Sequence, residues 1–148
     1  MKITENFTYE ELNPHKFEMS LGHKVNLEHL AFYTLQPLRD YYNEPLLITS
    51  GYRTIEYNNK IAGSNNSQHI RGQAVDFVVK DRKLLTKIFN DIDEIPKISY
   101  DQIIIYYNEG NPIPRWIHIS QNTRINRAEK LLCKINKNGR KYYQITDY

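Results

Sequence analysis

Two histidines and one aspartate stand in segments whose patterns would bring their side chains together. Asp76 lies in AVDFVV, residues 74–79, a run rich in β-branched residues and short enough for a strand. Strand alternation puts Asp76 on one face with Ala74 and Val78, opposite the face of Phe77. An unpaired carboxylate among apolar neighbours is costly. Asp76 therefore needs a cation, a set of hydrogen-bond donors or a metal ion.

The two histidines come from different segments. His118 lies in RWIHIS, residues 115–120, where alternation puts it on the same strand face as Trp116. His69 lies in the polar loop SNNSQHIRGQ, residues 64–73. Two imidazoles and one carboxylate, with a fourth position left to water, are the ligand pattern of catalytic zinc. Such a metal ion lowers the pKa of its bound water and polarises a carbonyl, as amide hydrolysis requires.

Structural interpretations of the same residues stay open at this point. His118 alone fits a hydrogen-bonded sheet histidine, and Asp76 fits a structural carboxylate paired with Arg71. From the spacing alone, these interpretations outweigh the metal site. Because Cys133 is the single cysteine, the chain forms no internal disulfide and no cysteine cluster can hold a metal ion. The remaining histidines are expected at the surface: His15, His23 and His29.

Length and composition indicate one soluble domain. The chain has 148 residues, 40% hydrophobic and 25% charged, so we expect a single domain over residues 1–148. No apolar run approaches the roughly 20 residues that cross a bilayer, and MKITENFTYEEL lacks the apolar core of a secretory signal. We therefore expect a protein made in the cytoplasm, with no membrane partner. The net charge of +3 is small and fits a solvated surface.

The order of elements predicts an α+β domain. Thr8 caps a first helix that ends at Asn13-Pro14. The sequence predicts further helices at 25–42, 54–63, 81–95 and 126–132, strands at 46–50, 74–79, 101–107 and 115–120, and a hairpin at 136–145 around Asn-Gly. We expect a small, mostly antiparallel sheet that packs against the N-terminal and central helices and carries the zinc site.

The motifs together resemble a known family. ITSGYRT, NNKIAGSNNSQHIRGQAVDF, YDQIII and WIHIS, in this order, resemble the zinc D-alanyl-D-alanine carboxypeptidase and L-alanyl-D-glutamate endopeptidase family. The chain looks most similar to its short bacterial and phage branch, from FTYEEL through NRAEKLL. The resemblance implies a zinc-dependent peptidase whose metal ligands are His69, Asp76 and His118.

The resemblance also implies roles for the surrounding residues. Arg53 of SGYRT would reach the site as a catalytic and substrate-binding residue, because its guanidinium pairs with two oxygens at once. Ser67, Gln68 and Trp116 would contact the substrate. Gly72 would allow the tight turn that brings the loop back over the following strand.

This chain departs from the family at the general base. Many relatives carry an acidic residue three positions before the last zinc histidine, where this chain has Arg115. The short branch often has a glutamate near the end of the DQ strand, where this chain has Tyr106. Asp101 or Glu109 could supply a base if the fold brings it to the metal ion. Tyr106 could donate to an oxyanion, but it is a poor base near neutral pH.

Two functions from different classes follow. The first is a zinc metallopeptidase that cuts D-amino-acid-containing peptides of cell-wall peptidoglycan in remodelling, phage entry or lysis. The second is a weak or inactive zinc-binding homologue that acts as a virion-associated or cell-wall-binding module. Nucleic-acid binding ranks below both, because the 12 tyrosines are scattered. We expect a monomer unless the protein is part of a virion.

Overall fold

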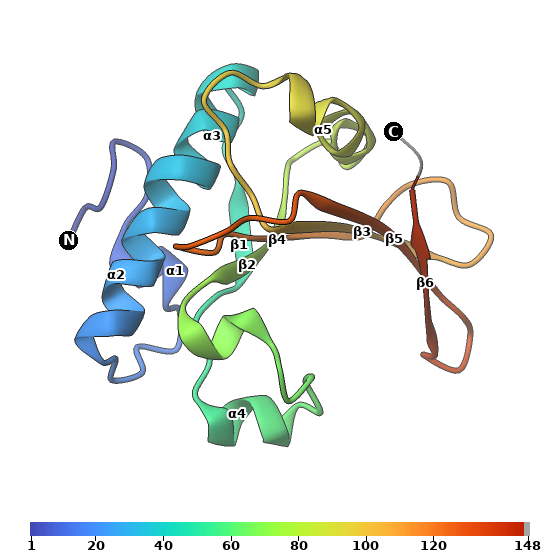
Figure 1. The fold of residues 1–148 in the computed structure, drawn as a ribbon. Coiled ribbons are helices and arrows are strands. Elements are labelled where there is room, and N and C mark those ends of the chain that lie inside the picture. Colours follow the sequence, from blue (N-terminus) through green and yellow to red (C-terminus); the bar gives the residue numbers. More distant parts are fainter. Residues whose placement is uncertain (147–148) are drawn as a thin grey trace.

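The computed structural model describes residues 1–146 (Figure 1). The α-helices are α1 (Tyr9–Leu12), α2 (Leu21–Leu30), α3 (Gln36–Tyr42), α4 (Ile55–Lys60) and α5 (Lys83–Asp91). The strands are β1 (Leu47–Ser50), β2 (Ala74–Val78), β3 (Gln102–Asn108), β4 (Trp116–Ser120), β5 (Glu129–Ile135) and β6 (Lys141–Ile145). Within the described residues, no helix is long and apolar enough to span a membrane.

The strands form one sheet in the order β1-β2-β4-β3-β5-β6. The pairings of β1 with β2, β2 with β4, β3 with β4 and β5 with β6 are antiparallel. The pairing of β3 with β5 is parallel, because the chain leaves β4, crosses the start of β3 and returns along its far side. The sheet is therefore mixed, within the α+β architecture that the sequence predicts.

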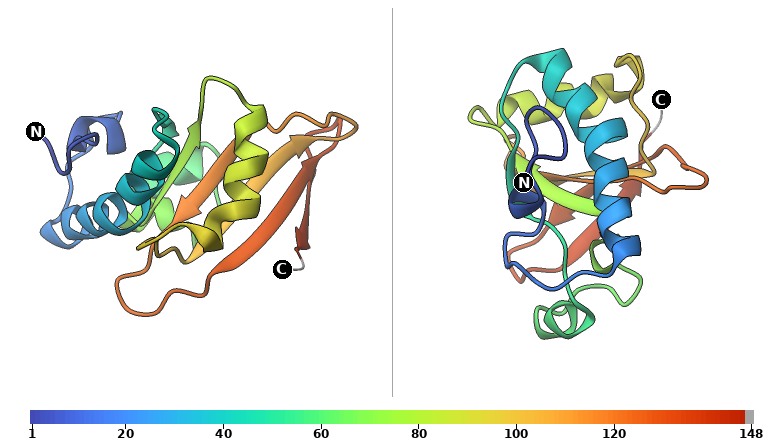
Figure 2. Two further views of the ribbon diagram at one scale, coloured as in Figure 1. Left: turned by 90° about the horizontal axis from the view of Figure 1, so that it is seen from above. Right: turned by 90° about the vertical axis from the view of Figure 1, so that its left-hand side faces the viewer.

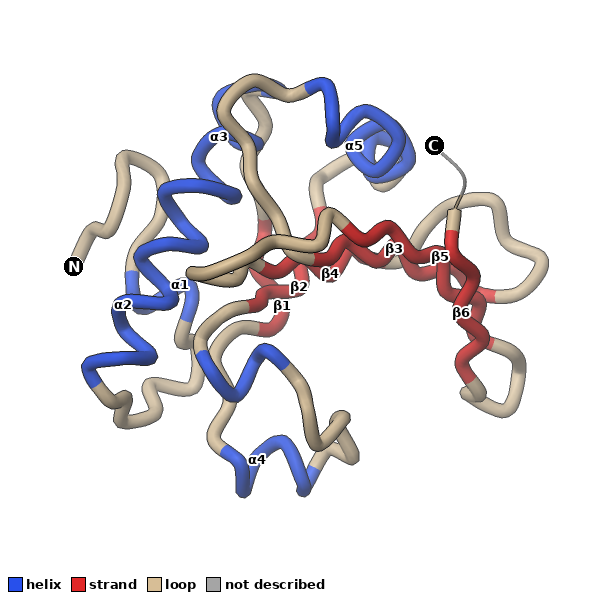
Figure 3. The backbone as a smooth tube through the Cα atoms, in the orientation of Figure 1, coloured by secondary structure: helices blue, strands red, loops and turns tan. Residues whose placement is uncertain are grey.

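The two faces of the sheet have different roles. Phe77 of β2, Ile103 and Ile105 of β3, and Ile117 of β4 are buried in the main core, and α5 lies over this face of the sheet (Figure 2). The opposite face carries Asp76, as the alternation of AVDFVV predicts. Below this second face lie α4 and the loop that follows it (Figure 3). Residues of this face and of that loop line one cavity.

The long N-terminal helix continues past a proline, as predicted. Helices α2 and α3 are joined by a π-helical turn, Ala31–Leu35, and Pro37 follows at the start of α3. A proline inside a helix displaces the carbonyl four residues earlier. That carbonyl, on Tyr33, accepts a hydrogen bond from the Ser99 amide at 2.9 Å. The wider turn and this outside donor explain why the helix does not end at Pro37.

The prediction of a helix at 126–132 is wrong. The segment from Glu129 onwards forms β5, which pairs along its whole length with β3. The expected hairpin is present: β5 and β6 are antiparallel, and Gly139 of the Asn-Gly turn has a φ of 80°. Residues 126–132 contain good helix formers, but the free edge of β3 offers a full ladder of hydrogen bonds that overrides local propensity.

Candidate active site

The sheet register brings Asp76 and His118 together. These residues are direct partners in the antiparallel pair of β2 and β4, on the face away from the main core. His69 comes from a 3-10 turn, Gln68–Arg71, that ends at Gly72 with a φ of 72°. This left-handed conformation favours glycine and turns the chain back into β2, as the sequence predicts. Three segments therefore converge on one point.

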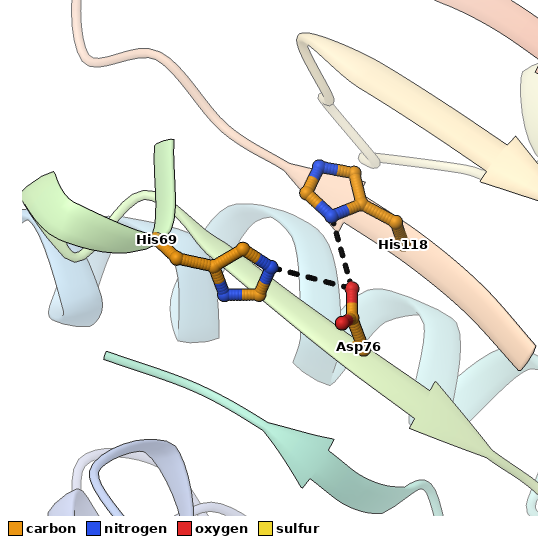
Figure 4. A group of neighbouring side chains, drawn as sticks. All are labelled: His69, Asp76 and His118. Atoms are coloured by element: carbon orange, nitrogen blue, oxygen red, sulfur yellow. Dashed lines mark hydrogen bonds and ion pairs between the residues drawn. The ribbon is translucent and has the colours of Figure 1, made fainter. Parts of the chain in front are cut away.

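Both imidazoles point to the same carboxylate oxygen (Figure 4). His118 Nδ1 lies 3.0 Å and His69 Nε2 lies 3.3 Å from Asp76 Oδ1. One ligand atom from each of the three side chains lies within 4.8 Å of the others. The side chains are buried or nearly so, with exposed fractions of 3% for His69, 16% for Asp76 and 12% for His118.

A backbone carbonyl fixes the orientation of His69. Its Nδ1 lies 2.9 Å from the Gly51 oxygen, which can only accept, so Nδ1 carries the proton and donates it. The ring therefore turns Nε2 towards Asp76. Donation from the second ring nitrogen to a carbonyl is the usual way in which proteins orient a metal-binding histidine. At Gly51 itself, a Cβ would lie 2.1 Å from the Leu12 carbonyl oxygen, so no larger residue fits.

The electrostatics of the three residues suit a divalent cation. Burial alone would raise the pKa of Asp76, but the two histidines outweigh it and hold the pKa well below its usual range. Burial lowers the pKa of His118, against the opposing effect of Asp76. The site thus combines a carboxylate that stays ionised with a His118 imidazole whose protonated form is disfavoured, and these are the forms in which such groups bind metals. The residues fit a zinc ion.

Arg53 lies beside these three side chains, as the resemblance implies. Its Nη2 lies 3.7 Å from Asp76 Oδ2 and donates to Ser50 Oγ at 3.0 Å. Its Nη1 donates to Asn58 Oδ1 at 3.3 Å, and its backbone amide donates to the His69 carbonyl. The Nε atom is buried without a hydrogen-bond partner. The guanidinium is therefore held in place next to the three candidate metal ligands His69, Asp76 and His118, which we call the metal-ligand group.

The group faces a cavity of about 740 Å³. The other predicted substrate contacts, Ser67, Gln68 and Trp116, line it together with Tyr106 and Asp101. Ser67 Oγ accepts from the His69 amide at 3.2 Å and so supports the turn that carries this histidine. Trp116 and Tyr106 are paired across β4 and β3, and their rings stack with centroids 4.3 Å apart.

The proposed bases do not both reach the cavity. Asp101 lines it, but Arg127 holds its oxygens through Nε and Nη2, with a shortest contact of 2.7 Å, and Gln68 donates to it at 3.1 Å. These hydrogen bonds overcome the effect of burial and lower the pKa of Asp101. Glu109 lines a different cavity, with Lys134. Of the carboxylates among residues 1–146, only Asp76 and Asp101 line the site.

Among the cavity-lining residues that sequence reasoning missed are Arg127, Lys141 and Tyr143. Arg127 lies in the loop that crosses from β4 to β5, and the other two lie on β6. The Asn-Gly signal predicts the hairpin but not the surface against which it folds. Finding these residues requires the parallel pairing of β5 with β3, which no local pattern indicates.

The comparisons with known proteins agree with this geometry. The family model described as Peptidase M15 matches residues 5–120. The chain belongs to the peptidase M15 family. Peptidases of the M15 family depend on zinc, and the matched region contains the three candidate ligands and Arg53. No curated protein matches the chain. The match ends with β4, so the crossover loop, β5 and β6 lie outside it.

Proposed function

We propose that this M15 family member is a zinc metallopeptidase that hydrolyses D-amino-acid-containing peptides of bacterial peptidoglycan, as a carboxypeptidase or an endopeptidase. The convergence of His69, Asp76 and His118 on one point of an open cavity carries this proposal. A zinc ion held by these residues supplies Lewis acidity, which polarises a carbonyl and acidifies water. The ionised carboxylate of Asp76 and the disfavoured protonation of His118 match what such an ion requires.

Arg53 is proposed to bind and orient the substrate. Its guanidinium is fixed by Ser50 and Asn58, so little side-chain entropy remains to be lost when it meets a substrate oxygen. A carboxylate or a carbonyl oxygen of the peptide suits this donor. Ser67 and Gln68 are proposed to shape the same part of the cavity, because each lies beside His69 in the turn.

Tyr106 is proposed to act as a hydrogen-bond donor. Burial, followed by a hydrogen bond with Tyr143, raises the pKa of its hydroxyl far above the usual value. The hydroxyl therefore stays protonated at neutral pH, and by turning from Tyr143 it could donate to a developing oxyanion, but it could not take a proton. With Asp101 held by Arg127, general-base assistance is weak at best. Its loss typically costs about 10²–10⁴ in rate, so we expect a slow enzyme.

The weak general-base assistance also supports a second candidate function. The cavity lining offers no carboxylate, among the described residues, beyond Asp76 and the paired Asp101. A zinc-containing homologue without an effective base would keep the fold and the peptide-binding cavity. Such a protein would serve as a virion-associated or cell-wall-binding module.

Metal analysis combined with a peptide assay separates the two candidates. The purified protein is analysed for zinc and then incubated with a muropeptide mixture, with and without a chelator, and the products are weighed by mass spectrometry. About one zinc ion per chain with chelator-sensitive cleavage supports the peptidase, and the product masses identify the bond. Stoichiometric zinc without cleavage favours the binding module. Absence of zinc binding refutes both.

A further inference from the structure

The C-terminal hairpin builds one wall of the active-site cavity. Lys141 and Tyr143 of β6 line the cavity together with Tyr106. In the ribbon, β6 curves away from the plane of the other strands towards the face that carries the site (Figure 1). This hairpin lies outside the segment that matches the M15 family model. It is therefore a place where this chain can set its own substrate preference.

A row of paired residues links this wall to the metal-ligand group. Trp116, Tyr106, Cys133 and Tyr143 are partners in turn across β4, β3, β5 and β6. This row is adjacent to the row of His118, which lies two residues from Trp116 on β4. Cys133 is small and fully buried, which leaves room for Tyr143 to approach Tyr106 with ring centroids 6.3 Å apart.

Lys141 stands over the same aromatic row. Its Nζ lies 5.7 Å from the centroid of the Tyr106 ring, a cation–π distance. The residue is exposed, and no carboxylate of residues 1–146 lies within 4.0 Å of Nζ. The ammonium group therefore lines the cavity without an ion-pair partner among the described residues.

The cavity as a whole has an excess of positive charge. Its cationic lining residues are Arg53, Arg71, Arg127 and Lys141, against the carboxylates of Asp76 and Asp101. Arg127 is compensated by Asp101, and Arg53 lies beside Asp76. A zinc ion would add to the excess. A cavity of this kind attracts a ligand with more than one negative group.

We propose that Lys141 and Tyr143 form a subsite that binds a second carboxylate of the substrate peptide, on the side of the cavity away from Arg53. Arg53 hydrogen-bonds to Ser50 of one edge strand, whereas Lys141 and Tyr143 lie on the other edge strand. The ammonium pairs with the carboxylate and the Tyr143 hydroxyl donates to it. This inference rests on the proposed function, because it assumes a peptide bound at the metal-ligand group.

The sheet geometry limits where this carboxylate lies on the peptide. Strand β6 is three strand spacings from β4, or roughly 14 Å along a flat sheet. An extended peptide spans that length in about four residues. Because the Lys141 side chain lies over the ring of Tyr106, the distance from its Nζ to the metal-ligand group is shorter than this. The second carboxylate is expected within about three residues of the peptide bond that is cut at the metal-ligand group.

The fluorescence of the single tryptophan allows peptide binding at this subsite to be measured without catalysis. Trp116 lies in the cavity, stacked on Tyr106, so a bound peptide should change its fluorescence. The tetrapeptide L-Ala–D-Glu–L-Lys–D-Ala is titrated into zinc-loaded protein, and the peptide with D-Gln in place of D-Glu is titrated in a second series. Fluorescence is recorded by stopped flow. We expect the D-Glu peptide to bind about three- to tenfold more tightly, since the pair is partly exposed to solvent.

Variants assign the preference to the hairpin. Lys141→Ala should reduce the ratio of the two affinities to about one, Lys141→Arg should retain it, and Tyr143→Phe should give an intermediate ratio. Lys134→Ala is the matched control, because Lys134 is paired with Tyr142 and so lies on the other face of the same hairpin. This variant should keep the wild-type ratio.

The outcomes separate this inference from the proposed function. Cleavage without a preference for the D-Glu peptide overturns the subsite and leaves the peptidase intact. A preference that disappears in Lys141→Ala, with no cleavage, supports the subsite and refutes the peptidase. A preference that survives in Lys141→Ala overturns the subsite. If zinc-loaded protein binds neither peptide, both proposals fail.

Discussion

Replacing Tyr106 with glutamate would place a carboxylate within reach of the metal-ligand group. In the sheet, Ile104 is the direct partner of His118, and Tyr106 is the partner of Trp116. Residue 106 is therefore the diagonal neighbour of His118, on the same face. Diagonal neighbours are about 7–8 Å apart, which long side chains can bridge. A glutamate at this position could accept a proton from water activated beside His118.

The expected gain follows from the surroundings of residue 106. General-base assistance is worth about 10²–10⁴ in rate. Lys141, whose Nζ lies 5.7 Å from the Tyr106 ring, and the hydroxyl of Tyr143 would compete for the new carboxylate. We therefore expect the lower end, an increase of about 10²-fold in kcat/KM. Loss of the stack with Trp116 should cost about 0.5–1.5 kcal/mol, which a domain of ordinary stability tolerates.

The assay is hydrolysis of a peptidoglycan tetrapeptide by zinc-loaded wild type and variants, followed by mass spectrometry. Tyr106→Gln is the control, because it has the size of glutamate and removes the same aromatic stack without adding a carboxylate. Zinc content and the thermal midpoint are measured for each variant. If Tyr106→Glu binds zinc, folds, and still hydrolyses no faster than Tyr106→Gln, the missing carboxylate is not what limits this protein.

Three further predictions concern other parts of the site. His118→Ala should lose stoichiometric zinc in elemental analysis while His15→Ala keeps it, and equal zinc in the two variants would refute the ligand assignment. Arg53→Ala should lower kcat/KM about tenfold or more with zinc content unchanged, and a normal kcat/KM would exclude substrate binding by Arg53. Asp101→Asn should lower the free energy of unfolding by about 1–2 kcal/mol, or the thermal midpoint by roughly 2–8 °C, because it weakens the pair between the buried Asp101 carboxylate and the half-exposed Arg127 guanidinium. Since the pKa of Asp101 is lower in the folded state than its usual value, this pair stabilises the fold above about pH 4 and is lost as the pH falls through the folded pKa. Denaturant unfolding should therefore show a smaller acid-induced loss of stability in Asp101→Asn than in wild type, and equal losses would contradict this account.

The strands around the metal-ligand group could be predicted because each has a local signal. Alternation in AVDFVV and RWIHIS places Asp76 and His118 on faces of separate strands, and the pairing of β2 with β4 makes those faces the same one. The turn before β2 is indicated by Gly72, whose φ is 72°. Here local chemistry and global fold agree, which is the condition under which sequence patterns succeed.

The crossover and β5 could not be predicted, because their structure depends on distant partners. Asp101 is held by Arg127, which is 26 positions further along the chain and has no pattern that pairs the two. The Ala, Glu, Lys and Leu residues of 126–132 favour a helix locally. The strand forms because β3 is already paired on one side with β4 and offers its other edge to β5. Pairing with β3 therefore overrides the local preference of these residues for a helix.

Tyr106 and Arg115, the positions at which the resemblance implies an acidic residue, belong to one structural unit. Arg115 lies 5.1 Å from the Trp116 ring centroid, Trp116 stacks on Tyr106, and Lys141 stands over Tyr106 from β6. A cation at each end of an aromatic pair stabilises the stack, since each ammonium or guanidinium meets a ring face. A glutamate at 106 would remove the ring that Trp116 and Lys141 both contact. The tyrosine therefore has its own partners in this chain, among them a hairpin outside the family match. These contacts fit a cavity with altered ligand binding, because the loss of a general base alone would not give the tyrosine partners on both β4 and β6.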